Sequence, residues 1–359
     1  MANINDYIKW RGDITLDISP LNIIDTMILS RFSYLPFQMV KVKAEETVGS
    51  AAKKFKDFDL KYLNISGDKA MALNISTSPR FKNIKVTDFR INTDMEAEKQ
   101  FAALTLHLPT GELFISYCGT DNTIVGWKED FNLSFMHDIP AQLEAIEYLK
   151  EIAKKYPKKK IYLAGHSKGG NLAVYAAMHA GKTLQKRLVK VINHDGPGFD
   201  KKTINTEEYK NIINKVYTYV PQSSVIGRLL EHEETYRVVK STEKGIMQHD
   251  IYSWQVLGTD IIQLKELTNG SKIVDKSLKN WLKKTTPNQR KAVVDLIYSL
   301  VGTTDALTTK DFAADKLKNI TTMMKSYSEL DKKDKEMIRL MTNKLIASMR
   351  ESLFDKDDE

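Results

Sequence analysis

The sequence predicts an α/β protein in which helices cover a mostly parallel sheet, followed by a helical C-terminal region. Short apolar runs of strand length alternate with helical periodicity between about residues 100 and 220. One of these runs enters a helix through a glycine-rich turn at residues 165–170. Beyond about residue 262 only helical patterns are found, so we divide the chain into an α/β domain over 1–262 and a helical region over 263–359.

The strand signals begin near Phe101. Two apolar runs on either side of Pro109-Thr110-Gly111 predict a hairpin formed by residues 101–108 and 112–118. Further runs of strand length cover residues 161–165, 188–192 and 215–220. Helical periodicity predicts helices over residues 21–29 and 137–156, and small helix-forming residues predict one over 171–180. Residues 44–65 predict a weaker helix. Strands and helices in this order are typical of a parallel sheet.

Composition excludes several classes of protein. The 359 residues include 42% hydrophobic and 28% charged side chains, which is an ordinary globular composition. The single cysteine, Cys118, excludes an intramolecular disulfide framework. The N-terminus lacks the basic start and apolar run of a secretory signal, and no stretch approaches the ~20 apolar residues of a membrane-spanning helix. We therefore expect a soluble, cytoplasmic protein.

The net charge of +8 favours solubility or attraction to an anionic partner. A nucleic acid is not the expected partner, because the sequence has no RNP-like motif, zinc-ligand spacing or phosphate-binding glycine-rich loop. We predict neither a metal nor an organic cofactor. The sequence carries no signal for the oligomeric state.

Residues 165–169, Gly-His-Ser-Lys-Gly, form a G-x-S-x-G pattern between a predicted strand and a predicted helix. A serine on so sharp a turn has strained backbone angles, and side chains two residues to either side would collide, so Gly165 and Gly169 are needed. The turn lifts the Ser167 hydroxyl clear of the sheet, and the first amides of the helix suit a developing oxyanion. The pattern in this context predicts a nucleophilic serine.

A serine hydroxyl needs a base, and the base needs an orienting acid. We predict His249 as the base, because it lies in a loop-like segment late in the chain; His232, on what reads as a charged helix face, is the alternative. We predict Asp195 as the acid, because it directly follows a strand and precedes Gly-Pro-Gly. Asp200 is the second choice and Asp250 a local one, and a plain turn aspartate is the ordinary interpretation of Asp-Gly.

Two backbone amides are expected to form an oxyanion hole. One belongs to Lys168, the residue after the nucleophile. The other should come from an earlier strand end, where the run Tyr117 to Asp121 makes Thr120 the expected donor. Gly119 in this run allows close approach of the backbone to a substrate.

These residues together resemble the class 3 (fungal-type) lipase family of α/β-hydrolases, and most closely a bacterial branch of it, over about residues 5–260. The matching segments are Asp25 to Phe37, Tyr117-Cys118-Gly119-Thr120, Trp127-x-x-Asp130, residues 165–170, Asp195-Gly-Pro-Gly-Phe199 and His249-Asp-x-x-Ser-Trp254. The resemblance implies an α/β-hydrolase fold and a Ser-His-Asp triad. Two features depart from the family: the loop Tyr219–Ser224 lacks the expected aspartate, and Cys118 replaces an arginine.

The C-terminal region contains a basic amphipathic segment over residues 272–284. Its two opposite faces carry Lys272, Lys276, Lys279 and Lys283 on one side and Val274, Leu278 and Trp281 on the other. Such a helix can rest weakly on an anionic membrane surface, although charged-out and apolar-in is also the ordinary pattern of a surface helix. Region 263–359 is therefore a candidate lid, interaction or membrane-surface element.

The leading hypothesis is a serine hydrolase that cleaves a carboxylic ester of a small molecule or lipid through an acyl-enzyme. Thioester or amide hydrolysis would use the same residues. The second hypothesis is a catalytically inactive binding or regulatory protein with this fold, peripheral to a membrane. The missing aspartate of the loop Tyr219–Ser224 motivates it.

Overall fold

The computed structural model describes residues 1–43, 45–59, 63, 65, 67–121, 123–304, 306 and 308–354. The chain forms two compact units, which are described separately below. The first comprises Met1–Thr93, Phe101–Gly119 and Ala141–Thr268. The second comprises Asp94–Gln100, Thr120–Pro140 and the chain from Asn269 onward. The second unit therefore includes two segments that precede residue 262 in the sequence.

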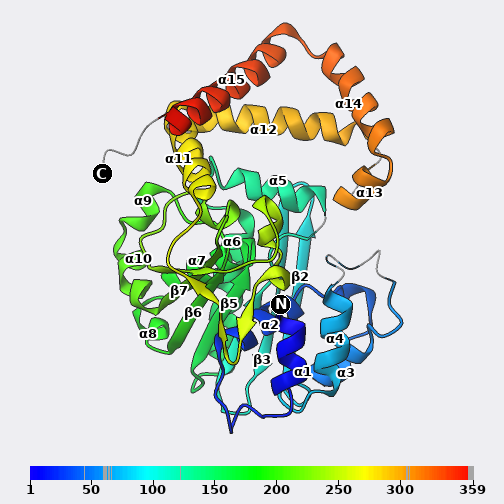
Figure 1. Cartoon of the computed structure of the whole chain (residues 1–359), viewed down its shortest axis with the longest axis vertical. Coiled ribbons are helices and arrows are strands. Elements are labelled where there is room, and N and C mark those ends of the chain that lie inside the picture. Colours follow the sequence, from blue (N-terminus) through cyan, green and yellow to red (C-terminus); the bar gives the residue numbers. More distant parts are fainter. Residues whose placement is uncertain are drawn as a thin grey trace. The chain divides into compact units, whose positions relative to one another are not determined.

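Within the described residues, the first unit is built on a nine-stranded sheet in the order β1-β2-β3-β4-β5-β6-β7-β8-β11 (Figure 1). The strands are β1 (Glu46–Thr47), β2 (Lys85–Asp94), β3 (Lys99–His107), β4 (Leu113–Tyr117), β5 (Ile161–His166), β6 (Leu188–His194), β7 (Val216–Pro221), β8 (Tyr236–Val239) and β11 (Gln263–Leu264). A separate pair joins β9 (Val256–Leu257) and β10 (Asp260–Ile261). Strands β4 to β8 are parallel, whereas β1–β2, β3–β4 and β8–β11 are antiparallel. The predicted hairpin and the α/β-hydrolase fold with a mostly parallel central sheet are confirmed.

The helices of the first unit lie on both faces of this sheet. They are α1 (Ile4–Arg11), α2 (Ile23–Phe32), α3 (Val48–Lys53), α4 (Gly67–Thr77), α6 (Pro140–Lys155), α7 (Lys168–Met178), α8 (Lys182–Gln185), α9 (Lys201–Ile204) and α10 (Glu207–Ile212). Ser116 of β4 donates to the carbonyl of Ser30 in α2 at 3.4 Å, whereas Tyr117 donates to the carbonyl of Ala145 in α6 at 3.0 Å. Because successive strand residues point to opposite faces, α2 and α6 cover opposite sides of the sheet.

Several sequence-based expectations need correction. The weak helix expected over residues 44–65 is confined to α3, and its positions 44, 60–62 and 64 lie outside the described residues. Helix α4, which follows, was not predicted. Strand β2 was missed because most of its side chains are exposed or half-buried, so that its sequence has no clear apolar alternation. Strand β11 lies beyond residue 262, where none was expected, and two residues are too few to show a period.

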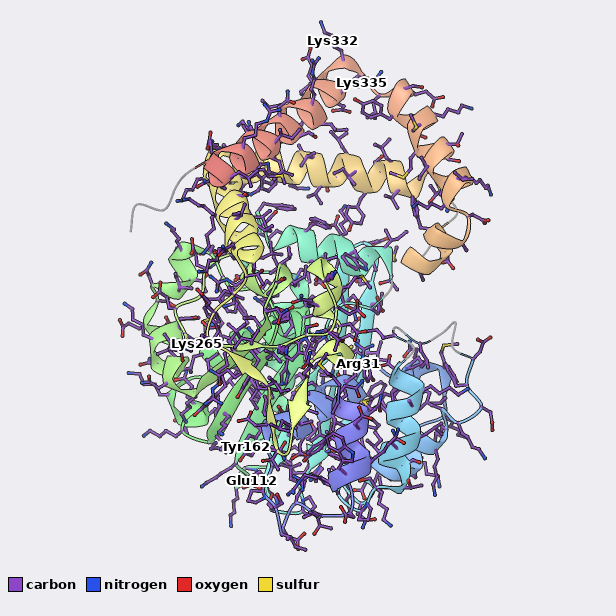
Figure 2. All side chains as sticks on the ribbon, viewed as in Figure 1. Arg31, Glu112, Tyr162, Lys265, Lys332 and Lys335 are labelled. Carbon is purple, nitrogen blue, oxygen red and sulfur yellow. The ribbon has the colours of Figure 1, made fainter. Side chains whose placement is uncertain are left out.

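Two buried ion pairs fix α2 against the rest of the first unit. Arg80 contacts the Asp25 carboxylate through Nε at 2.7 Å and Nη2 at 2.5 Å. Arg31, which Figure 2 labels, holds Asp68 of α4 in the same two-point manner at 2.6 and 2.7 Å. Paired, hydrogen-bonded charges avoid the large cost of burying either charge alone. The end of α2, and with it Tyr34, is thereby held over the sheet.

The described part of the second unit is largely helical. Its helices are α5 (Ile124–Asn132), α11 (Asn269–Lys284), α12 (Pro287–Gly302), α13 (Thr309–Ala314), α14 (Lys316–Glu329) and α15 (Lys332–Phe354). The predicted segment 272–284 lies in α11, and Trp281 donates from Nε1 to the carbonyl of Met341 in α15 at 3.2 Å. Over the described residues, no helix combines the length and apolar character needed to cross a bilayer. The cytoplasmic location stays a prediction.

Candidate active site

Ser167 lies on a strained turn between β5 and α7. Its φ is +57° and its ψ −136°, a backbone conformation that costs energy for any residue with a side chain. The turn is held from both sides, because the Ser167 amide donates to the carbonyl of His194 and the Gly170 amide donates to the carbonyl of Ser167, both at 2.9 Å. The structure therefore places the predicted serine at a strand-to-helix elbow.

The glycines around the elbow are explained by close backbone contacts. A Cβ at Gly165 would lie 2.2 Å from the carbonyl oxygen of Gly169, and a Cβ at Gly169 would lie 2.2 Å from that of Tyr117. A Cβ at Gly119 would lie 2.5 Å from the carbonyl oxygen of His166 and 3.1 Å from the Ser167 Cβ. Side chains at these positions would force the elbow and the end of β4 apart. The loop after β4 thus packs directly against the serine.

His249 and Asp195, 54 residues apart, meet in the first unit. His249 donates from Nδ1 to Asp195 Oδ2 at 2.7 Å. Asp195 is fully buried, whereas the His249 ring, at the end of a short 3-10 helix (Gly245–His249), is partly exposed. This contact leaves Nε2 of His249 as the nitrogen that can accept a proton.

The Asp195 carboxylate is positioned by the neighbouring strand and by the loop after it. Its backbone has a φ of +54°, and its amide donates to the carbonyl of Tyr219 in β7 at 2.8 Å. Ser224, in the loop after β7, donates from Oγ to Asp195 Oδ1 at 2.5 Å. A Cβ at Gly227 would lie 2.2 Å from the same oxygen. The loop after β7, which lacks the family's aspartate, therefore supplies a hydroxyl to the carboxylate of Asp195, the residue directly after β6.

His166, which sequence reasoning did not select, links the elbow to His249. Its ring contacts the His249 ring in a tilted arrangement, with centroids 4.5 Å apart, and its Nε2 donates to the His249 carbonyl at 2.8 Å. Tyr34 donates its hydroxyl to the His166 carbonyl at 2.9 Å. Burial, and then the neighbouring His249, hold the pKa of His166 well below its usual range, so this ring stays neutral. The position of His166 directly before Ser167 is visible in the sequence, but its contact with His249 is not.

The alternative acids and base have other partners. Asp200 accepts from the Thr203 amide at 2.8 Å and caps α9, and Asp250 accepts from the Tyr252 amide at 2.9 Å. His232 does not lie on a helix face as expected; it lies in a loop, with a buried side chain whose Nδ1 is 2.9 Å from Glu234. The charged run around it did not form a helix.

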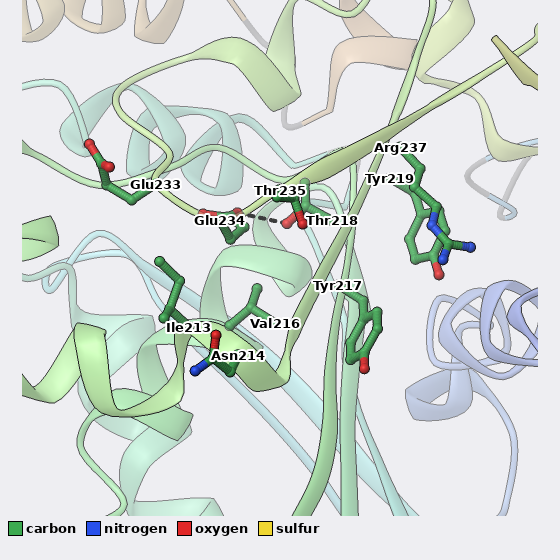
Figure 3. Close-up of a pocket in the computed structure, with 10 residues that line it drawn as sticks. All are labelled: Ile213, Asn214, Val216, Tyr217, Thr218, Tyr219, Glu233, Glu234, Thr235 and Arg237. Atoms are coloured by element: carbon green, nitrogen blue, oxygen red, sulfur yellow. Dashed lines mark hydrogen bonds between the residues drawn. The ribbon is translucent and has the colours of Figure 1, made fainter. Parts of the chain in front are cut away.

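Glu234 belongs to a buried polar cluster beside a hollow of about 380 Å³ (Figure 3). The described residues that line the hollow are Ile213, Asn214, Val216, Tyr217, Thr218, Tyr219, Glu233, Glu234, Thr235 and Arg237. Burial opposes ionisation of Glu234, but hydrogen bonds, led by the one from His232, lower its pKa to about 2. The lining includes neither Ser167 nor His249, so the hollow is separate from the candidate active site.

The two backbone amides expected to form the oxyanion hole, those of Lys168 and Thr120, belong to different chain segments. Lys168 is the first residue of α7, so its amide lies at the positive, N-terminal end of the helix. Thr120 follows Gly119 and belongs to the second unit, where its hydroxyl donates to Asp130 Oδ2 at 2.5 Å. Cys118, at the position of the family's arginine, is buried in the first unit and packs with Tyr34. Among the described residues, no three His, Cys, Asp or Glu side chains gather closely enough to hold a metal ion.

The resemblance noted in the sequence is matched by a family model. The model of the Mbeg1-like family matches residues 75–299, which is more than half of the chain. The chain belongs to the Mbeg1-like family. The matched residues of this Mbeg1-like protein contain the elbow at Ser167, the Asp195 turn and His249.

Solved structures of fungal lipases resemble the chain at low identity. Rhizomucor miehei lipase in complex with its propeptide is 14% identical, with a TM-score of 0.42, over 66% of this chain and 79% of that lipase. A fungal lipase–inhibitor complex, described as a model for interfacial activation, is 13% identical, with a TM-score of 0.40, over 61% of this chain and 78% of that one. Among curated proteins, none matches the sequence. The assignment of the fold rests on the strand order and elbow of this chain.

Proposed function

We propose that this protein is a serine hydrolase that cleaves carboxylic esters through an acyl-enzyme. The observation that carries the proposal is the 2.7 Å contact between His249 Nδ1 and the buried carboxylate of Asp195. The ring of this histidine contacts the ring of His166, the residue before the strained Ser167. A carboxylate on Nδ1 keeps the proton there and leaves Nε2 free to act as a base, which is what activation of a serine hydroxyl requires.

In the proposed reaction, His249 Nε2 takes the hydroxyl proton of Ser167 while the serine Oγ attacks the acyl carbon. The amide of Lys168 donates a hydrogen bond to the resulting oxyanion, and Thr120 stays the second donor expected from the sequence. The ester C–O bond then breaks, and His249 gives the proton to the departing alcohol. A water molecule then loses a proton to the same imidazole and attacks the acyl carbon. The bond between that carbon and Ser167 Oγ breaks, His249 returns the proton to Oγ, and the acid leaves. Asp195 stabilises the imidazolium in both halves.

The contacts of Asp195 favour an active enzyme over the inactive protein that the missing aspartate of the loop Tyr219–Ser224 motivated. Asp195 has a histidine on one carboxylate oxygen and Ser224 on the other. The substrate class is proposed as an ester of a small molecule or lipid. Hydrolysis of thioesters or amides would use the same residues. Assays with each class of substrate distinguish these activities.

The proposal is tested with a fluorophosphonate probe and a panel of p-nitrophenyl esters, thioesters and anilides. We expect the probe to label the folded chain on Ser167 and to leave Ser167→Ala unlabelled. We expect His249→Ala to lower ester turnover at least ~10³-fold. His137→Ala, which changes an exposed histidine, is the matched control and should keep full turnover. A folded protein without labelling, or equal hydrolysis by the wild type and Ser167→Ala, would overturn the proposal.

A further inference from the structure

Helix α14 of the second unit turns an apolar face outward. Leu317, Ile320, Met324 and Tyr327 are 83%, 37%, 68% and 40% exposed. Residues three and four positions apart lie on the same face of a helix, so these side chains form one continuous row. We call this row the α14 apolar stripe. At 1.5 Å per residue it is about 15 Å long.

The opposite face of α14, which is turned toward its own unit, is mostly polar. Asn319 is buried and donates to the carbonyl of Phe312 at 3.1 Å. Thr322 and Ser326 are half-buried on the same side, and Met323 is the apolar residue among them. A helix that only packs on its own domain shows the reverse pattern, with apolar residues inside and polar residues in water. Scattered single apolar residues on a surface are ordinary, but a continuous row on one helix points to something that covers it.

The charge of α14 indicates the nature of that covering surface. The helix contains Lys316, Lys318 and Lys325 against one carboxylate, Glu329, which gives it a net charge of +2. Lysines that flank an apolar row can bury their aliphatic stems beside it while their ammonium groups meet anionic headgroups. A second copy of the chain would instead bring the lysines of one stripe against those of the other, which is unfavourable. The stripe is also short for a stable dimer, which buries about 800 Å² on each partner.

We propose that the α14 apolar stripe docks on the surface of an anionic lipid bilayer, with α14 lying in the plane of the interface. The apolar side chains enter the headgroup and acyl boundary, and the flanking lysines contact the lipid phosphates. Beyond Glu329, Lys332 and Lys335 lie at the beginning of α15 (Figure 2). The segment 272–284 is a weaker candidate for this contact, because its Val274, Leu278 and Trp281 are half-buried in α11.

The test is co-sedimentation of the full-length protein with vesicles of phosphatidylcholine alone or mixed with phosphatidylglycerol. We expect binding to the mixed vesicles that weakens with added salt. Leu317→Gln with Met324→Gln should weaken it at least about tenfold, since two large apolar side chains are removed from the interface. Lys316→Glu with Lys325→Glu should weaken it by a similar factor. The matched control is Ile18→Gln with Leu257→Gln, which changes two residues of the first unit that are 74% and 72% exposed and should bind like the wild type.

Three outcomes would overturn the proposal: no binding of the wild type to the mixed vesicles, equal binding by the Leu317/Met324 variant, or a wild-type dimer in solution that this variant abolishes. The last result would assign the stripe to a second copy of the chain. Circular dichroism confirms that the variants are folded, as expected for changes at exposed positions. Hydrolysis of a water-soluble ester should be the same in all of them, so that failure of membrane binding is distinguishable from failure of the proposed activity.

Discussion

Replacing Asp195 by asparagine removes the charge opposite His249 while keeping the size of the side chain. At an effective dielectric constant of ~20, two unit charges 2.7 Å apart attract each other by about 6 kcal/mol. This attraction is made when the imidazolium forms, so its loss corresponds to about 10⁴ in rate. Ser224 adds a second effect, because its donation to Oδ1 favours the asparagine oxygen there and turns the amide NH₂ toward His249 Nδ1. The neutral His249 ring then carries its proton on Nε2, and this nitrogen can no longer accept the proton of Ser167. We therefore expect Asp195→Asn to lower kcat by about 10³- to 10⁴-fold.

The assay for Asp195→Asn is steady-state hydrolysis of a soluble p-nitrophenyl ester, with urea unfolding to establish that the variant is folded. Asp200→Asn is the matched control, since it makes the same chemical change five residues later at the cap of α9. Asparagine caps a helix about as well as aspartate, so both stability and kcat of the control should stay near the wild type. A folded Asp195→Asn protein with kcat within about threefold of the wild type would refute the reasoning.

Three further changes test the surroundings of the site. Ser224→Ala removes the hydroxyl that donates to Asp195; a hydrogen bond to a charged group contributes ~1.5–3 kcal/mol, so kcat in the same ester assay should fall about 10- to 100-fold. Gly165→Ala places a Cβ 2.2 Å from the Gly169 carbonyl oxygen, and we expect a loss of more than about 3 kcal/mol in urea unfolding. Burial lowers the pKa of His194 from 6.5 to about 3, so the unfolded chain binds a proton that the folded chain does not. The stability contributed by the neutral ring is present above pH 6.5 and is lost as the pH falls toward 3, by about 1.4 kcal/mol per pH unit, and His194→Gln should flatten this part of the urea-unfolding profile.

Each of these variants has a matched control. Ser223→Ala changes the neighbouring serine, whose hydroxyl contacts Thr268 rather than Asp195, and should keep wild-type kcat. Gly270→Ala adds a Cβ in open space within α11 and should leave stability equal or higher by up to ~1 kcal/mol. His137→Gln changes an exposed histidine and should preserve the pH dependence of stability. A control that loses as much as its test variant would show that the effect does not arise at the site.

The elbow and the central sheet could be predicted because their signals are local. Gly165 and Gly169 flank Ser167 within five residues, a short apolar run precedes them, and small helix-forming residues follow them. Strand β2 and helix α4 escaped prediction, since the exposed side chains of the one and the mixed composition of the other leave no clear pattern. His249 could be chosen as the candidate base only because its loop lies late in the chain order.

By itself, the sequence determined the fold class, the serine at the elbow and a short list of acids and bases for it. Only the tertiary structure brings Asp195, Ser224 and His249 together, because they lie on three segments whose encounter depends on strand order and not on spacing. It also brought His166 against His249 and exposed the apolar side of α14. Periodicity reports which residues share a face, but what that face meets is set by long-range packing, which a single chain segment does not encode.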